Sequence, residues 1–293
     1  MKPIPAGMYD ELRSHIAELL SAGVIETSNS PFSSNIVLVR KKDNSLRMCV
    51  DYRTLNSRTK RDCYTIPRVE PLIDSLKDAK YFCSLDMISG YNQVAVAEEH
   101  KERTAFITPC GFYQMRKMPF GLSNSPSTFQ RMVEKVLDGL MTVCTVFLDD
   151  ILVHGKTENE MYVNLSLVFD RLRQAGLKLK PKKCRFFQSS IDYLGFTVSP
   201  EGVRCSDQHI EDVKKWIEPT NVKELQSFLG FANFHRRFIA GFAQIAEPLT
   251  KLLRGHTNVK RSHAKKTNKS KNVSDPEPWK WDQEQQSAFD NLK

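Results

Sequence analysis

The hydrophobic positions of the chain repeat with helical and with strand spacing, in turn, along most of its length. Apolar residues at helical spacing, followed by Gly23, predict an amphipathic helix over residues 8–22. Runs rich in Val, Ile and Phe that flank turn residues predict hairpins, at residues 35–53, 104–118, 141–154 and 191–202. Further helices are predicted before residue 81, after Ser125 as N-cap and Pro126, and over 157–175, where Thr157 and Glu160 form a capping box. Strands and helices are mixed, so the pattern predicts an α+β fold.

The pattern changes in the last third of the chain. From Asp207 to about residue 253 it predicts three short amphipathic helical segments, separated by Pro219 and Gly241. Residues 254–278 carry almost no apolar side chains and are strongly basic before Ser274. Such a segment cannot bury enough surface to order itself. It is interpreted as a flexible arm that either binds nucleic acid nonspecifically or has no role.

Composition narrows the class of protein. The chain of 293 residues is long enough for about two domains. Its net charge of +9 and pI near 9.1 favour a polyanionic partner, either nucleic acid or an acidic membrane surface. No apolar run approaches the roughly 20 residues of a membrane span, and the first residues lack the apolar core of a signal peptide. Seven scattered cysteines without a C-x-x-C pair indicate reduced thiols in an intracellular protein.

Two adjacent acids, Asp149 and Asp150, sit between the apolar runs of the predicted 141–154 hairpin. Ionised carboxylates repel each other and are costly to bring into apolar surroundings, and a divalent cation such as Mg²⁺ removes both difficulties. The simpler alternative is an exposed turn, since Asp is a common turn residue. A third acid, Asp86, interrupts the apolar run 81–94. One acid at a strand end beside an acid pair is the ligand set of a two-metal phosphoryl-transfer site.

Four motifs occur in the order LDMISGYNQV, MPFGLSNSPSTFQRMV, FLDDILV and YLGFTVSPEG. In sequence and order they resemble the reverse transcriptase of gypsy-type long-terminal-repeat retrotransposons, over residues 3–254. The resemblance implies an α+β right-hand polymerase with fingers, a palm built from an antiparallel sheet plus helices, and a helical thumb. It assigns fingers and the approach to the palm to 1–80, palm with a fingers insertion to 81–204, thumb to 205–254, a basic linker to 255–278, and the start of a truncated ribonuclease H-like domain to 279–293.

The same resemblance implies an RNA-directed DNA polymerase, a nucleotidyltransferase that extends a DNA primer on an RNA template with deoxynucleoside triphosphates. Two Mg²⁺ ions, with Mn²⁺ as a substitute, are expected on Asp86, Asp149 and Asp150. The expected nucleotide-binding residues are Lys41, Lys42, Arg47, Tyr91, Phe120 and Gly121. The expected primer-binding residues are Leu194, Gly195 and Phe196, and Gln130 is expected to contact the template.

Several of these roles have alternatives. The triphosphate is bound by either Lys41 or Lys42, and the choice is left open. Tyr91 is either a gate against the ribose 2′-hydroxyl or an ordinary buried tyrosine. The alternative to a template contact for Gln130 is a solvent-facing position on its helix. His235, Arg236 and Arg237 either contact the duplex backbone or form a solvated face.

The chain departs from the family pattern at Phe147, where relatives usually have Tyr, and at residues 254–278, where their connection is much shorter. The acids of a ribonuclease H site are absent, so ribonuclease H and integrase domains are expected elsewhere in a parent polyprotein, in the cytoplasm within virus-like particles. A catalytically silent retroelement remnant that binds nucleic acid and a different two-metal enzyme, such as a nuclease, are the alternative functions.

Overall fold

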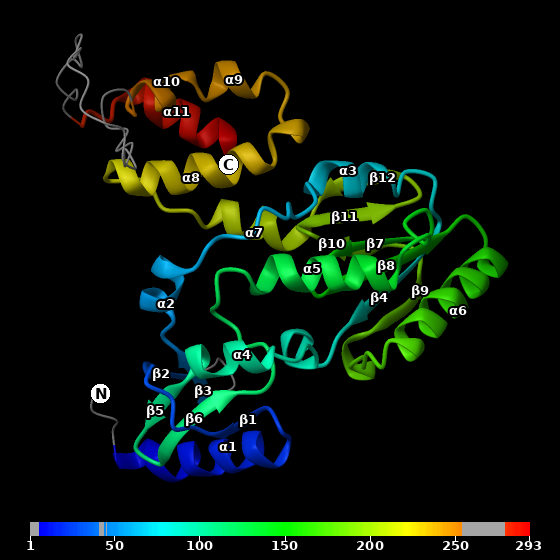
Figure 1. Ribbon diagram of the computed structural model, residues 1–293. Coiled ribbons are helices and arrows are strands. Elements are labelled where there is room, and N and C mark those ends of the chain that lie inside the picture. Colours follow the sequence, from blue (N-terminus) through cyan, green and yellow to red (C-terminus); the bar gives the residue numbers. More distant parts are fainter. Residues whose placement is uncertain (1–5, 41–43, 45, 254–278) are drawn as a thin grey trace, which may run out of the picture. The chain divides into compact units, whose positions relative to one another are not determined.

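The computed structural model describes residues 6–40, 44, 46–253 and 279–293, so Lys41, Lys42 and the expected basic linker 255–278 lie outside the described residues. The chain divides into two compact units, residues 1–191 and 192–293 (Figure 1). The expected boundary between palm and thumb, after residue 204, lies within the second unit. Within the described ranges, no helix has both the length and the apolar character that a bilayer span requires.

The first unit begins with helix α1 (Tyr9–Ser21) and a five-stranded sheet. The sheet has the order β1-β6-β5-β2-β3, formed by Ile25–Thr27, Gly111–Met115, Phe106–Thr108, Ser34–Arg40 and Leu46–Val50. Leu12 and Ile16 of α1 pack on Ile36 and Phe106 of the sheet, and this burial holds the helix in place. Gly23, at φ +64°, supplies the left-handed residue that follows the helix. The helix and both hairpins predicted in this region are confirmed.

A four-stranded antiparallel sheet is the second sheet of this unit, in the order β7-β8-β4-β9. Its strands are Cys144–Phe147, Asp150–Gly155, Tyr81–Asp86 and Arg185–Gln188. Helices α5 (Ser125–Val136) and α6 (Glu158–Gln174) pack beside it (Figure 1). Their fully buried Phe129 and Val168 join Leu85 and Ile151 of the central strands in one core. This core fixes the ends of β4 and β8 relative to each other.

Some local expectations need correction. The 81–94 run is strand only as far as Asp86, because Ser89 adopts a left-handed conformation (φ +45°) and a short 3₁₀ helix, Gly90–Gln93, follows. Ser125 is the first residue of α5 rather than its N-cap, and its hydroxyl donates to the carbonyl oxygen of Pro119. The helix predicted before residue 81 is α3 (Val69–Asp74), which ends earlier than expected. Two further helices of the unit, α2 (Arg53–Arg58) and α4 (Glu98–Lys101), were not predicted.

The second unit joins a three-stranded sheet to a group of helices. The strands are β10 (Ile191–Tyr193), β11 (Phe196–Ser199) and β12 (Gly202–Cys205). The helices are α7 (Asp207–Lys214), α8 (Val222–Phe234), α9 (Phe242–Ile245), α10 (Glu247–Lys251) and α11 (Gln283–Leu292). The third predicted segment is two helices, with Pro248 at the start of α10.

Helix α11 belongs to the core of this second unit. Phe289 of α11 packs on Phe228 of α8, with ring centroids 4.6 Å apart, and both rings are buried. Residues 279–293 resemble the opening strand and helix of a ribonuclease H domain, which predicts a strand before α11. Residues 279–282 form no strand, so this part of the prediction is wrong. The described C-terminal residues therefore complete the packing of the helical unit.

Candidate active site

Strand register brings the three predicted acids to one end of the four-stranded sheet. Asp86, the last residue of β4, lies directly opposite Asp150, the first residue of β8. Phe147 pairs with Asp150 across the β7–β8 hairpin, so Leu148 and Asp149 form its two-residue tip. Side chains of directly opposed residues lie about 5 Å apart at Cβ. The three carboxylates therefore meet, as the sequence predicts.

The hairpin tip is held by a side chain whose predicted role was wrong. Leu148 has φ +54°, a conformation that is strained for a branched side chain. Its backbone N–H donates to Oε1 of Gln130 at 2.6 Å, while Nε2 of Gln130 donates to the carbonyl oxygen of Val146 at 3.1 Å. Gln130 is fully buried, so it is neither a template contact nor a solvent-facing residue. It fixes the tip that carries Asp149.

Asp149 is confined on the side facing the 3₁₀ helix. A Cβ placed on Gly90 would lie 2.8 Å from Oδ1 of Asp149 and 2.9 Å from the ring of Phe129. This Oδ1 atom is buried and has no hydrogen-bond partner among the described residues. Burial, and then the charges of Asp150 and Asp86, raise the pKa of Asp149. A buried carboxylate oxygen without a donor is costly unless a cation reaches it.

A lysine that sequence reasoning missed supplies positive charge to the cluster. Nζ of Lys183, in the short 3₁₀ helix Pro181–Lys183, lies 3.1 Å from Oδ2 of Asp86. Crowding by protein atoms and the charge of Asp86 raise the pKa of Asp150, and Lys183 opposes that rise. In the sequence, Lys183 is one of several basic residues in the stretch LKLKPKKCR, and nothing in that stretch distinguishes it from its neighbours.

The donor set suits a hard divalent cation. All ligand atoms that Asp86, Asp149 and Asp150 offer are carboxylate oxygens, which Mg²⁺ and Mn²⁺ prefer. The unpartnered Oδ1 of Asp149 and the ammonium group of Lys183 beside Asp86 both indicate a place where positive charge is needed. The residues present therefore fit the cation that the sequence predicts.

Tyr91 lies beside this cluster, on the 3₁₀ helix. Its ring packs on Phe120, with centroids 4.7 Å apart, and edge-on against Phe129 at 5.2 Å. Tyr91 is 8% exposed whereas Phe120 is 48% exposed, so the two rings form a step from the core to the surface. Burial, and then the charge of Asp149, raise the pKa of Tyr91. The predicted aromatic thus stands next to the acids.

The Phe120–Gly121 segment is fixed by an asparagine that sequence reasoning also missed. Nδ2 of Asn56 donates to the carbonyl oxygen of Gly121 at 2.8 Å, and its Oδ1 accepts from the N–H of Ser123 at 2.8 Å. Gly121 has φ +94°, which favours glycine, and a Cβ there would lie 3.6 Å from the carbonyl oxygen of Val50. Glycine is therefore required at position 121 by the positive φ of the backbone and not by a lack of space for a side chain.

The other predicted contacts lie outside the acidic cluster. Arg47 is exposed on β3 opposite Val39, and Arg40 of the neighbouring strand is engaged by Glu11. Leu194 and Gly195 both have positive φ and form the tip of the β10–β11 hairpin in the second unit, with Phe196 first in β11. His235 is 5% exposed, so neither alternative given for it, a contact with the duplex backbone or a solvated face, is correct.

A structural comparison defines the class of protein. A structure of the foamy viral protease-reverse transcriptase in complex with RNA/DNA hybrid matches 99% of this chain and 37% of that chain, with a TM-score of 0.79 and 25% sequence identity. Together with the sheets and helices described above, this match shows the α+β right-hand polymerase fold.

Sequence comparisons then give the family. Residues 39–198 match the family model of reverse transcriptase (RNA-dependent DNA polymerase). The chain is 38% identical to the retrovirus-related Pol polyprotein from transposon opus of Drosophila melanogaster over 90% of its length, and 33% identical to that from transposon gypsy of the same organism over 99%. It covers 27% and 28% of these two polyproteins. The chain belongs to the reverse transcriptase family, and its relatives are Pol polyproteins of gypsy-type retrotransposons.

The raised carboxyl pKa values predict how the metal-free protein responds to pH. Because the pKa of Asp149 and of Asp150 lies above the ordinary value of 3.8, the folded state binds more protons than the unfolded state above that value. Stability of the hairpin should then fall as pH rises through the raised pKa values, and Mg²⁺ should reverse the fall. Hydrogen exchange of β7 and β8 amides, with chelator or Mg²⁺, measures this. A hairpin that gains stability over this range without metal would contradict it.

Gly90→Ala is expected to lower the primer-extension rate about tenfold, because the added methyl group would lie less than 3.0 Å from both Asp149 and Phe129 and at least one of these side chains has to shift. Single-turnover extension at saturating nucleotide measures the effect. Gly139→Ala provides a control for the loss of a glycine, since nothing lies within 4 Å of its Cβ position, although its own φ of +80° adds local strain. Equal rates for Gly90→Ala and the unaltered chain would show that the site tolerates the added methyl group.

Proposed function

We propose that this chain is the RNA-directed DNA polymerase part of a retrotransposon Pol polyprotein. The observation that carries the proposal is the meeting of Asp86, Asp149 and Asp150 at one sheet end, with a buried carboxylate oxygen of Asp149 left without a donor. Structural acids on a surface turn would instead be solvated or paired. A foamy viral relative of the same fold has been solved with RNA/DNA hybrid, which supports RNA and DNA strands as partners here.

The three carboxylates would hold two Mg²⁺ ions. When bound, such a pair activates the attacking hydroxyl and stabilises the leaving phosphate oxygen of an in-line displacement. The protein prepares the site for them by fixing the hairpin tip through Gln130 and by keeping Asp149 against Gly90. Lys183 lowers the repulsion among the acids through its ion pair with Asp86.

Side chains beside the acids would position and select the nucleotide. The ring of Tyr91, held between Phe120 and Phe129, presents a fixed wall next to Asp149. A wall at the sugar would collide with a 2′-hydroxyl and so favour deoxynucleotides. The exposed ring of Phe120 and the backbone of Gly121 are proposed to pack on the forming base pair, and the exposed Arg47 to bind triphosphate oxygens.

The template strand is proposed to lie in a cavity of the first unit. A cavity of about 850 Å³ is lined by apolar side chains, including Val94 and Met118, and by the basic side chains of Arg58, Lys60 and Arg103. Apolar surface for bases beside cations for phosphates is the usual form of a single-strand site. In the second unit, the glycine turn Leu194–Gly195 and Phe196 are proposed to hold the primer end.

Other parts of the parent polyprotein would supply ribonuclease H and integrase activities, since the chain spans about a quarter of its relatives' length. All seven cysteines are free thiols. Free thiols support the proposal of a cytoplasmic protein, within virus-like particles.

Primer extension on a homopolymer RNA template, with Mg²⁺ or with chelator, tests the function. We expect stepwise addition of deoxynucleotides that stops when the cation is removed. Duplex binding without extension would indicate the silent remnant, and release of nucleotides from the duplex would indicate a nuclease.

A further inference from the structure

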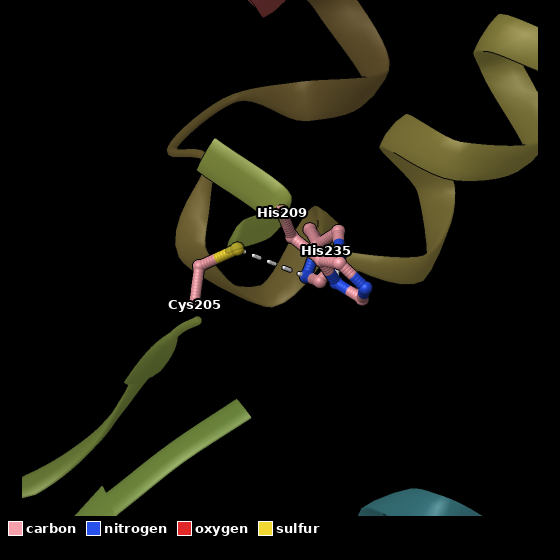
Figure 2. Close-up of side chains that lie close together, drawn as sticks. All are labelled: Cys205, His209 and His235. Atoms are coloured by element: carbon pink, nitrogen blue, oxygen red, sulfur yellow. Dashed lines mark hydrogen bonds between the residues drawn. The ribbon is translucent and has the colours of Figure 1, made fainter. Parts of the chain in front are cut away.

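A second cluster of ligand-type side chains lies in the helical unit, and the polymerase proposal does not use it. Cys205 ends β12, His209 is in the first turn of α7, and His235 follows the last residue of α8. Sγ of Cys205 lies 3.4 Å from Nδ1 of His235, and Nδ1 of His209 lies 3.0 Å from Nε2 of His235 (Figure 2). One ligand atom from each residue can be chosen so that all three lie within 4.8 Å of one another.

The surroundings hold this cluster in place. His235 is 5% exposed, and its ring is packed by Phe196, Phe231 and Phe234, with centroids 4.9 to 5.5 Å away. The backbone N–H of His209 is held by the hydroxyl of Ser206, the N-cap of α7. Cys205 and His209 are half-buried and remain open to solvent on one side. The cluster is therefore accessible to a small ion from solvent, and the surrounding aromatic rings hold the side chain of His235 in place.

We propose that Cys205, His209 and His235 bind one zinc ion, with water as the fourth ligand. A thiolate and two imidazoles are ligands that Zn²⁺ prefers, and Mg²⁺ does not compete for them. Zn–S bonds of about 2.3 Å and Zn–N bonds of about 2.1 Å place tetrahedral ligand atoms roughly 3.4–3.6 Å apart. The separations of 3.4 Å between Sγ of Cys205 and Nδ1 of His235, and of 3.0 Å between Nδ1 of His209 and Nε2 of His235, are each close to these values. They involve different ring nitrogens of His235, so only one of them applies to a given ion.

Zinc binding exchanges one hydrogen bond for coordination. A metal ion binds a single ring nitrogen of His235, whereas Cys205 contacts Nδ1 of that ring and His209 contacts Nε2. An ion on Nδ1 therefore requires the side chain of His209 to turn toward it, and an ion on Nε2 requires that of Cys205 to do so. Cys205 and His209 are the half-exposed members, so their side chains make this adjustment while His235 stays fixed. The thiol releases its proton to solvent when it binds.

The ion would brace the turn that precedes β11. A Cβ on Gly195 would lie 2.5 Å from Cε1 of His209, so the ring of His209 rests directly on this turn. Phe196, the next residue, stacks on Phe234 with centroids 5.2 Å apart. Zinc would thus tie strand β12 and helices α7 and α8 together beneath the Leu194–Phe196 turn. The inference that zinc helps this turn to hold the primer end rests on the proposed function. The inference that the three side chains bind zinc does not depend on that function.

The test uses the reduced 293-residue chain with saturating Mg²⁺ and without template, primer or nucleotide. Titration with Co²⁺ should give one ion per chain with a thiolate-to-metal charge-transfer band, and Zn²⁺ should displace it. Cys205→Ser should remove the band and weaken zinc binding by about 100-fold or more. His209→Gln should weaken binding similarly without opening the core, and Cys63→Ser, which changes an exposed thiol, should bind normally.

Zinc should also slow hydrogen exchange at residues 193–197 in the unaltered chain but not in His209→Gln. Absence of the cobalt band in the unaltered chain would overturn the proposal. So would a zinc affinity of folded Cys205→Ser or folded His209→Gln equal to that of the unaltered chain. If Cys205→Ser does not fold by circular dichroism, His209→Gln decides the matter. None of these readouts depends on polymerase activity, so failure here leaves the primer-extension test unaffected.

Discussion

Asp149→Asn is expected to lower the rate of primer extension at least about 1000-fold while the fold is retained. The amide keeps the shape of the side chain but removes the charge of a proposed metal ligand. Because Oδ1 of Asp149 is buried without a donor and its pKa is raised, loss of the charge relieves repulsion in the metal-free protein. Resistance to urea should therefore be equal to or higher than that of the unaltered chain.

Single-turnover extension with saturating Mg²⁺ and nucleotide measures this loss. Asp138→Asn is the matched control, since it makes the same chemical change at an exposed aspartate in the same unit. Its rate should equal that of the unaltered chain. If Asp149→Asn kept most of its activity, the assignment of Asp149 as a metal ligand would be wrong.

Tyr91→Val is expected to reduce the preference for deoxynucleotides over ribonucleotides about 100-fold. The tyrosine ring is fixed by contacts with Phe120 and Phe129, so it cannot turn aside for a 2′-hydroxyl. Valine fills only part of that volume and would leave room beside the sugar that is proposed to lie there. The ratio of kcat/KM for a deoxynucleotide and its ribonucleotide, on one template, measures the change.

Tyr91→Phe separates the ring from its hydroxyl. It keeps the wall and should keep the sugar preference, even though it removes the group whose pKa is raised by burial and by Asp149. Unchanged sugar selectivity in folded Tyr91→Val would leave Tyr91 as an ordinary buried tyrosine.

The sequence was sufficient for the elements that carry the acids. The apolar runs around Asp149 and Asp150 predict two strands and a tight turn, and the run before Asp86 predicts a third strand. Alternation and turn chemistry are local properties, so they can be read from neighbouring residues. The antiparallel register that places Asp86 opposite Asp150 is a property of the folded sheet.

The errors occurred where a side chain's role depends on distant neighbours. Gln130 looks like a surface helix residue, yet it lies against the hairpin tip and holds Leu148. His235 looks like a basic surface residue beside two arginines, yet aromatic rings enclose it. Lys183 and Asn56 carry no local signal that separates them from other lysines and asparagines. The burial of a side chain and its hydrogen-bond partners depend on packing between segments far apart in the sequence, so they cannot be predicted from one segment alone.

The sequence by itself determined the α+β fold class, most strands and helices, the three acids and the family resemblance, because each follows from residue type, spacing or motif order. Only the tertiary structure decided that Asp149 has a buried oxygen without a donor, that Lys183 faces Asp86, and that Cys205, His209 and His235 meet. Charge repulsion and metal affinity depend on distances of a few ångströms between residues far apart along the chain, and folding alone sets those distances.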